Sequence, residues 1–424
     1  MKKLLKSLIV KILWAQVARL RARHNPVVIA VAGSIGKTGT KRAIATVLSG
    51  AKEVRWQDGN YNDIVSVPLI FFGQTMPSLF NPLGWLKVVI ANEKQIRGSY
   101  TPEIVVLEVG TDYAGNMDEF VLRLKADYGV LTGISAEHMM NFVDMDAVAE
   151  EELKISQIAD TLIVNGDLVD KKYRTFATGT MLYGEGSYDC IINPSKLTKD
   201  LYRPVMFDVP SLKKQVSIKT RMVGRHNLSG LAAAALLGFT LGLTDDDVTS
   251  GLEKIQPDAG RMRLLLGKKQ SLLIDDTYNS SPEAVTAALN TLYEVPGTTK
   301  IAILGQMNEL GEFSKQMHLD IGEACDPKQL DLLVTIGADA NTYLAKAAEG
   351  AGCKVVRCPS PYHAADIVRP LLKKGTIVLI KGSQNKVFAE EAIKDLLHNS
   401  TDQAKLVRQS SKWIKVKEKQ FKHV

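Results

Sequence analysis

The chain lacks several features that define common protein classes. Its four cysteines show no C-x-x-C spacing, which argues against a disulfide framework and against a zinc site. No apolar run reaches the roughly 20 residues of a membrane-spanning helix without a charge or a proline. Internal repeats and low-complexity linkers are missing as well. What remains is an ordinary composition, 45% hydrophobic and 23% charged over 424 residues, which predicts a cytoplasmic globular protein of two or three domains.

The net positive charge of the chain lies at its two ends and not in its middle. The net charge is +7, but residues 1–23 carry seven Lys or Arg and no acid, and residues 405–424 carry seven against Glu418. The body between these ends is therefore net acidic. Because nucleic-acid binding needs a basic surface, we expect no nucleic-acid partner.

The first 23 residues do not read as a signal peptide, because Lys6 and Lys11 interrupt the apolar run and no small-residue cleavage site follows. Apolar residues recur at helical spacing and predict a short basic amphipathic helix over residues 1–25. Such a helix either binds an anionic membrane surface or packs on the protein's own body. A second apolar stretch, 79–90, joins the same surface or belongs to the core. The predicted apolar stripe is Leu4, Leu5, Leu8, Ile9, Ile12 and Leu13.

Residues 27–38 are the most informative segment. A buried strand over 27–32 is followed by the sequence Gly-Ser-Ile-Gly-Lys-Thr, which opens a helix. Backbone N–H groups and the positive end of the helix dipole would bind phosphate there, with the lysine reaching the β- and γ-phosphates and the threonine hydroxyl on Mg²⁺. Val31 stands where the general phosphate-loop pattern has glycine, although strand, loop and helix fall in the right order. The segment predicts a nucleoside triphosphate site formed by Gly33, Ser34, Gly36, Lys37 and Thr38.

Strand and helix patterns alternate in two blocks, which predicts an α/β protein with a phosphate-loop ATPase-type central domain over residues 26–258 and a Rossmann-like α/β domain over residues 259–400. Residues 171–220 are less regular and predict a small antiparallel excursion. Gly260 marks the boundary, and residues 401–424 form a basic tail. The predicted strands are 27–32, 103–109 and 128–134 in the first block, and 272–275, 300–304, 332–336, 354–357 and 376–380 in the second.

The other candidate ligands follow strands, where α/β sheets carry their sites. Glu108 closes the strand 103–109, and a carboxylate there can coordinate Mg²⁺. His138 follows the next strand, in a setting where a lone histidine is more often structural than a ligand. Asp275 and Asp276 end another strand, where they either cap the sheet or hold a ribose or phosphate across a cleft.

Taken together, these residues resemble the Mur ligase family over residues 26 to 400. Three of the matching segments, at 60–62, 274–282 and 304–312, are similar to the member of the family that adds D-alanyl-D-alanine. The matches are G-S-I-G-K-T at 33–38, N-Y-N at 60–62 followed by Val67-Pro68, G-R-H-N at 224–227, G-R-M at 260–262, I-D-D-T-Y-N-S-S-P at 274–282, L-G-Q-M-N-E-L-G-E at 304–312 with His318 downstream, and K-G-S at 381–383.

The resemblance implies an ATP-dependent, Mg²⁺-requiring ligase that activates a carboxylate as an acyl phosphate and forms an amide bond with an amine. The implied partners are a small-molecule or peptide cell-wall precursor and an amino acid or dipeptide. We expect a monomer in the cytoplasm, or one that contacts the inner membrane surface through the N-terminal helix. The residues carried over are Lys37, His138, Glu152 and Arg261 as catalytic groups; Thr38, Glu108 and His138 as metal ligands; the phosphate loop with Asn227, Arg261, Asp276 and Asn279 for ATP; and Asn60, Asn62, Asn279, Glu309, Lys381 and Ser383 for the other substrates.

The sequence departs from the family pattern in three ways. Only 26 residues precede the phosphate-loop strand, so we expect the family's UDP-binding domain to be missing, which leaves UDP recognition open. Glu152 aligns with a carbamylated lysine of the family, and its carboxylate could replace the carbamate. Lys154 is the alternative if the helix register shifts. Gly39 replaces a Ser or Thr, a change that we expect to be mild.

Two other functions stay open. A folylpolyglutamate-synthase-like ligase would share fold and mechanism, but the segment D-D-x-Y-N argues against it. A non-catalytic ATP-binding scaffold would leave Lys37, Glu108 and Arg261 without a purpose.

Overall fold

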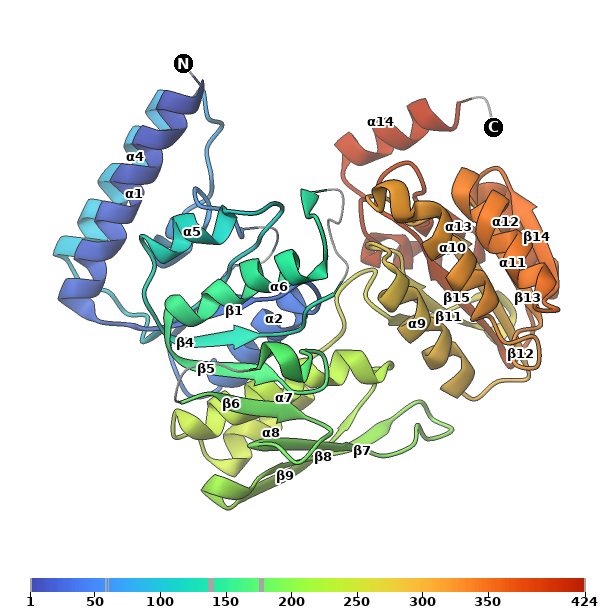
Figure 1. The fold of residues 1–424 in the computed structure, drawn as a ribbon, viewed down its shortest axis with the longest axis horizontal. Coiled ribbons are helices and arrows are strands. Elements are labelled where there is room, and N and C mark those ends of the chain that lie inside the picture. Colours follow the sequence, from blue (N-terminus) through green and yellow to red (C-terminus); the bar gives the residue numbers. More distant parts are fainter. Residues whose placement is uncertain (1, 58, 60, 136–140, 175–178, 423–424) are drawn as a thin grey trace.

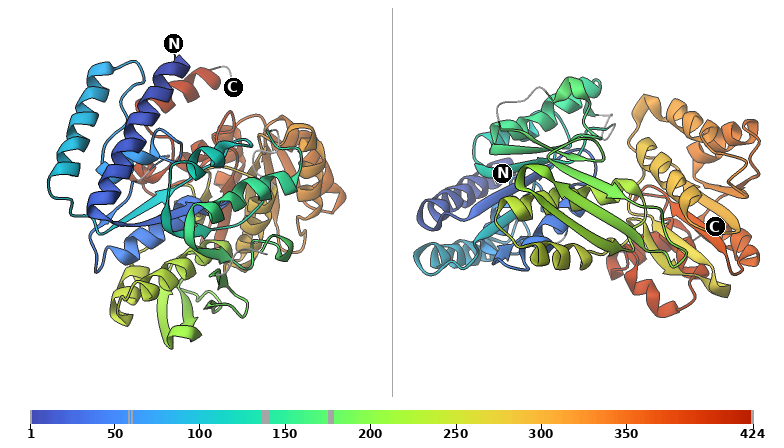
Figure 2. Two further views of the ribbon diagram at one scale, coloured as in Figure 1. Left: turned by 60° about the vertical axis from the view of Figure 1, so that its left-hand side comes forward. Right: turned by 90° about the horizontal axis from the view of Figure 1, so that it is seen from below.

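The computed structural model describes residues 2–57, 59, 61–135, 141–174 and 179–422. Figures 1 and 2 show two bodies, each built around its own sheet. The predicted division at residue 259 falls between the two sheets. Within the described residues, no helix has both the length and the apolar character needed to cross a membrane.

The first sheet has nine strands in the order β2-β3-β1-β4-β5-β6-β7-β8-β9. Neighbouring strands are parallel from β2 to β7, whereas β7, β8 and β9 are antiparallel, which is the predicted excursion. The strands are β1 (Val27–Ala32), β2 (Val54–Arg55), β3 (Ile104–Glu108), β4 (Ala126–Leu131), β5 (Ala159–Asn165), β6 (Met181–Gly184), β7 (Cys190–Pro194), β8 (Arg203–Val209) and β9 (Lys214–Thr220).

Helices cover both faces of this sheet because successive side chains of a strand point to opposite faces. On β1, Ile29 and Val31 pack on one side with α2, α7 and α8, while Val28 and Ala30 pack on the other with α1, α3 and α4. The helices of this body are α1 (Lys2–His24), α2 (Lys37–Leu48), α3 (Val67–Phe72), α4 (Pro82–Arg97), α5 (Asn116–Val121), α6 (Met145–Leu153), α7 (Arg225–Thr240) and α8 (Asp245–Glu253).

The second sheet has the order β10-β11-β15-β12-β13-β14 and is parallel except for β10, which confirms the predicted Rossmann-like arrangement. Its strands are β10 (Arg263–Leu266), β11 (Leu272–Asp276), β12 (Thr299–Gly305), β13 (Leu332–Ile336), β14 (Val355–Cys358) and β15 (Thr376–Lys381). Its helices are α9 (Pro282–Glu294), α10 (Ser314–Glu323), α11 (Ala345–Gly350), α12 (Pro361–Val368), α13 (Glu390–Leu396) and α14 (Ser411–Gln420).

The N-terminal helix packs on the protein's own body, which was one of the two predicted alternatives, but it does not have the single apolar stripe that was predicted. Helix α1 is part of the first body's core, because Leu13, Trp14, Val17 and Leu20 are buried against the sheet's helices. The predicted stripe is therefore divided between two faces. Ile9 and Leu13 are buried, whereas Leu5, Leu8 and Ile12 are exposed.

The segment predicted as a basic tail is folded onto the second body. The Lys417 ammonium of α14 is buried, 2.8 Å from Glu390 Oε1 and 2.7 Å from Glu391 Oε1 on α13. Arg408 forms a second ion pair with Glu390 at 2.6 Å. Buried acids on α13 thus explain why a stretch rich in lysine packs rather than extending into solvent.

Candidate active site

The phosphate loop has the predicted form, with β1 entering it and α2 leaving it. Gly33 and Gly36 have φ angles of +127° and +82°, which glycine adopts without strain. A Cβ at Gly33 would stand 2.4 Å from the Thr132 hydroxyl, so only glycine fits there. The Ser34 hydroxyl is buried without a hydrogen-bond partner among the described residues. Since Ser34 lines the pocket, its hydroxyl would be satisfied by donating a hydrogen bond to a bound oxyanion.

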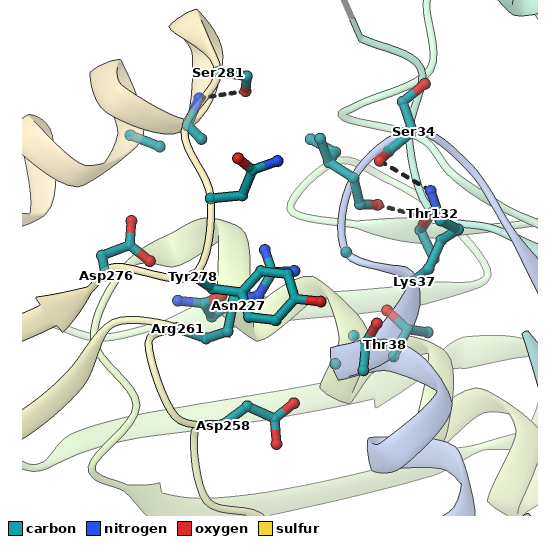
Figure 3. A pocket seen from close by; sticks show the side chains of 18 of the residues that line it. Ser34, Lys37, Thr38, Thr132, Asn227, Asp258, Arg261, Asp276, Tyr278 and Ser281 are labelled. Carbon is teal, nitrogen blue, oxygen red and sulfur yellow. Dashed lines mark hydrogen bonds between the residues drawn. The ribbon is translucent and has the colours of Figure 1, made fainter. Parts of the chain in front are cut away.

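Lys37 and Thr38 begin α2 and line the pocket in front of this loop. The Lys37 ammonium donates to the Gly33 carbonyl. It also donates to the Ser34 carbonyl at 3.1 Å (Figure 3). It is thus folded back along the loop whose N–H groups would surround a phosphate. The orphan N–H groups at the start of α2 add positive potential at the same place.

Glu108 stands beside Thr38 because β3 and β1 are parallel and pair Glu108 with Val31. The Thr38 hydroxyl donates to Glu108 Oε2 at 3.1 Å. A hydroxyl and a carboxylate that converge on a phosphate pocket are the ligand types that Mg²⁺ prefers. The Lys41 ammonium is 3.0 Å from the same Oε2, and both side chains are buried. Lys41 is therefore the counter-ion of the Glu108 carboxylate, although the sequence motifs did not single it out.

Glu152 lies behind the loop rather than in front of it. Its Oε2 accepts a hydrogen bond from the Gly33 N–H at 2.8 Å, and its Oε1 accepts one from the Thr111 hydroxyl at 3.2 Å. Glu152 does not belong to the described residues that line the pocket. Lys154 points elsewhere, because its ammonium pairs with Asp118 and Glu151 at 2.8 Å.

The second body contributes two carboxylates at the end of β11. Asp276 pairs with the Lys381 ammonium at 2.7 Å, as expected from the register that sets these residues side by side on β11 and β15. Lys381 also donates to the Asn279 carbonyl at 2.9 Å, which fixes the loop after β11. Asp275 accepts from the Gly260 N–H at 3.0 Å and the Thr277 hydroxyl at 2.6 Å, and burial raises the pKa of Asp275 to about 6.

Arg261 follows the tight turn at Gly260. Its guanidinium lies over the Tyr278 ring, 4.1 Å from the centroid, so the side chain has a preferred orientation. Figure 3 shows Arg261, Tyr278 and Asn227 between the phosphate loop and Asp276. The Asn227 amide donates to the Val223 carbonyl at 3.1 Å at the start of α7.

A single pocket joins these groups across the two bodies. From the first body it takes the phosphate loop, Glu108 and Asn227, and from the second body Arg261 and Asp276. The candidate site is thus an interdomain cleft with the glycine loop before α2 on one side and an arginine on the other. Asn62, Asn279, Glu309 and Lys381 also line it.

Three predicted site residues within the described part of the chain, Gly33, Glu152 and Ser383, do not line the pocket. Asn60 and His138 lie outside the described residues. Ser383 is buried and accepts from the Asn308 N–H at 2.8 Å, so it orders a loop beside the pocket. Among the described residues, no group of three or more His, Cys, Asp or Glu forms a metal cluster, and Thr38 and Glu108 are the predicted metal ligands that the structure places side by side.

Sequence reasoning missed a support for the loop after β11. Arg408 donates to the carbonyls of Thr277 and Tyr278, at 2.5 and 2.9 Å, while its ion pair with Glu390 holds the guanidinium in place. No local motif surrounds Arg408, and only the folded C-terminal segment reveals its contact with the pocket's loop.

Comparisons with known proteins agree with this arrangement. A model of the Mur ligase middle domain matches residues 31–238, and a model of the Mur ligase, glutamate ligase domain matches residues 260–384. The chain is 27% identical over 384 residues to the UDP-N-acetylmuramoyl-tripeptide–D-alanyl-D-alanine ligase of Bacillus subtilis, covering 88% of this chain and 76% of the relative.

Two solved structures share the fold. MurF from Acinetobacter baumannii superposes with a TM-score of 0.75 at 23% identity, over 93% of this chain and 81% of that one. MurF ligase from Thermotoga maritima, solved in complex with ADP, gives a TM-score of 0.73 at 23% identity, over 92% and 83% of the two chains.

Proposed function

The chain belongs to the Mur ligase family, and we propose that it joins D-alanyl-D-alanine, or a similar amine, to the carboxylate of a cell-wall peptide precursor with ATP as the energy source. The observation that carries the proposal is the interdomain pocket, in which Lys37 and Arg261 approach one cavity from two bodies. The names of the relatives support the substrate class. The reaction takes place in the cytoplasm, where ATP is available, and the protein acts as a monomer.

The proposed reaction transfers the γ-phosphoryl group of ATP to the precursor carboxylate. The amine then attacks the resulting acyl phosphate at its carbonyl carbon, and inorganic phosphate leaves as the amide forms. The chain's contribution is positioning and charge neutralisation, since phosphoryl transfer leaves little covalent chemistry for the protein. Lys37 and the N–H groups of the loop hold the transferring phosphates from one side. Arg261 neutralises charge from the other side.

The remaining site residues have supporting roles in this proposal. Thr38 and Glu108 would hold Mg²⁺, which would supply further positive charge at the β- and γ-phosphates. Asn227, Asp276 and Asn279 would contact the nucleotide. Asn62, Glu309 and Lys381 would contact the precursor or the amine.

Glu152 would keep the Gly33 N–H aligned from behind the loop. In this role the Glu152 carboxylate acts through the loop, because it stands behind the loop and does not line the cavity.

The experiment measures phosphate release from ATP with a muramoyl-tripeptide precursor and D-alanyl-D-alanine. Release should require both substrates and should fall at least about a hundredfold in Lys37→Ala, as for the loss of a main charge-stabilising group. Lys346→Ala, which removes an exposed lysine of α11, is the matched control and should keep wild-type turnover.

Two outcomes would favour the other functions. Release with a folate and glutamate, but not with the cell-wall substrates, would indicate a folylpolyglutamate-type ligase. ATP binding without phosphate release under either condition would indicate a scaffold.

A further inference from the structure

Two helices of the first body, α1 and α4, lie side by side at its outer edge, on the side away from the second body (Figures 1 and 2). The two helices run parallel, because residues later in α1 contact residues later in α4. Arg19 pairs with Glu93 at 2.6 Å, and one turn further the His24 ring contacts the Ile96 carbonyl at 3.0 Å.

Each helix carries an exposed apolar stripe that runs toward the Arg19–Glu93 ion pair. Residues three, four or seven apart lie on one face of a helix, and Ile12 is seven residues from Arg19 while Ile90 is three residues from Glu93. Because the ion pair joins the two helices, the stripes border each other on the outer surface. The stripes are Leu5, Leu8 and Ile12 on α1, and Leu83, Leu86 and Ile90 on α4.

This surface is unusually apolar for the exposed side of a body that has a complete core. Of the eighteen large apolar residues that are exposed in the described chain, eight belong to α1, α4 and the turn before α4, where Met76 and Phe80 add to the stripes. The exposed fractions range from 37% for Leu5 to 70% for Leu83. Contiguous exposed apolar surface of this kind marks an interaction site.

The charges around the stripes have one sign. Helix α1 has seven Lys or Arg and no acid, and α4 has three and one acid. That acid, Glu93, is already occupied by Arg19 and lies 3.7 Å from Arg97. Lys11 and Lys87 are exposed beside the stripes, so the rim of the surface is positive.

We propose that the α1–α4 surface, formed by α1, residues 76–80 and α4, docks this protein on an anionic lipid membrane. Helices that lie in the membrane interface place apolar side chains at the acyl boundary and lysines among the headgroups, which is the pattern found here. The uniformly positive rim matches anionic phospholipid and would repel a second copy of the same surface. The proposal depends on neither ATP nor the ligase reaction, so it stands or falls independently of the proposed function.

The test is co-sedimentation of the full chain with phosphatidylcholine vesicles, with and without phosphatidylglycerol, at low and high salt. We expect binding only to the vesicles that contain phosphatidylglycerol, and its loss at high salt. Lys11→Gln with Lys87→Gln should weaken binding about 25-fold, at about fivefold for each lysine near the surface. Leu83→Gln with Leu86→Gln should weaken it at least about tenfold.

Matched controls change the same residue types elsewhere. Lys412→Gln with Lys415→Gln removes two exposed lysines of α14, and Leu212→Gln with Leu266→Gln removes two exposed leucines, and both should bind as the wild type does. All variants should keep the wild-type melting temperature because the changed side chains are exposed.

Two results would overturn the proposal. One is equal binding to neutral and anionic vesicles, or none to either. The other is sedimentation velocity showing concentration-dependent dimers that disappear in Leu83→Gln with Leu86→Gln, which would make the surface a protein interface.

Discussion

The buried ion pair between Lys41 and Glu108 gives the sharpest stability prediction. The ammonium and the carboxylate are 3.0 Å apart, and their side chains are 0% and 5% exposed. Lys41→Met keeps the apolar stem but leaves the carboxylate buried without its cation. Breaking a buried pair from one side costs about 3–5 kcal/mol, because the remaining charge has lost both water and partner. The expected loss is therefore a large part of a domain's total stability.

A double-mutant cycle separates the pair from the packing of the lysine. Lys41→Met with Glu108→Gln removes both charges and should be at least about 2 kcal/mol more stable than Lys41→Met alone. The surface pair of Lys52 and Glu103, at 3.4 Å, is the matched control, and Lys52→Met should cost less than about 1 kcal/mol.

The assay is urea unfolding followed by tryptophan fluorescence, since three of the four tryptophans, Trp14, Trp56 and Trp85, belong to the first body. A cost below about 1 kcal/mol for Lys41→Met, or no recovery in the double variant, would refute the reasoning that Glu108 depends on this lysine.

Three further predictions concern Glu152, His318 and helix α1. Glu152→Gln should slow turnover at least about tenfold, or 1.4 kcal/mol, with no response to bicarbonate, because an amide can no longer accept hydrogen bonds from both the Gly33 N–H and the Thr111 hydroxyl. Bicarbonate-dependent activity would instead implicate Lys154. Burial lowers the pKa of His318, whose Nε2 accepts from the Met307 N–H, so the unfolded chain binds its proton more readily. Stability should therefore be full above a pH of about 6.5 and fall below it, and His318→Gln should flatten that slope in unfolding curves taken from neutral to mildly acidic pH; an unchanged slope would be evidence against this source. A chain that begins at Asn25 should be insoluble or unfolded by circular dichroism, because it loses the core residues of α1, and a truncated chain with a wild-type melting temperature would contradict that packing.

Much of the candidate site could be predicted from local sequence, because its geometry is local. The strand, the glycine loop and the helix of residues 27–48 follow one another within a few turns, and their phosphate-binding form is set by backbone angles that only glycine adopts easily. The alternation of strands and helices likewise predicted the second sheet, whose strands lie within two residues of the expected bounds except for β10.

The contacts between distant segments could not be predicted in this way. Lys41 reads as an ordinary polar residue of a helix, and only the packing of α2 against β3 and its neighbours buries it beside Glu108. Arg408 lies 130 residues from the Tyr278 carbonyl to which it donates. Such pairings depend on tertiary packing, which local residue patterns do not encode.

The buried face of helix α1 was difficult to predict from the sequence for a different reason. Its apolar residues cover two faces, one buried in the core and one exposed, so a single helical stripe drawn through the sequence mixed residues from both. Leu5 and Leu8 of the predicted stripe precede the buried residues in sequence and are exposed. Their exposure places these residues on the outer surface of the first body and not in its core.

The central claim is that one ATP site is assembled from both bodies, and the most direct test compares Lys37→Ala, Arg261→Ala and the double variant in ATP-dependent ligation of D-alanyl-D-alanine. Each single change should reduce turnover at least about a hundredfold, and the double variant should lose little more than the worse single, because groups that act on one transition state are not additive. Wild-type turnover in Arg261→Ala would contradict the claim, since the second body would then contribute no essential charge to the site.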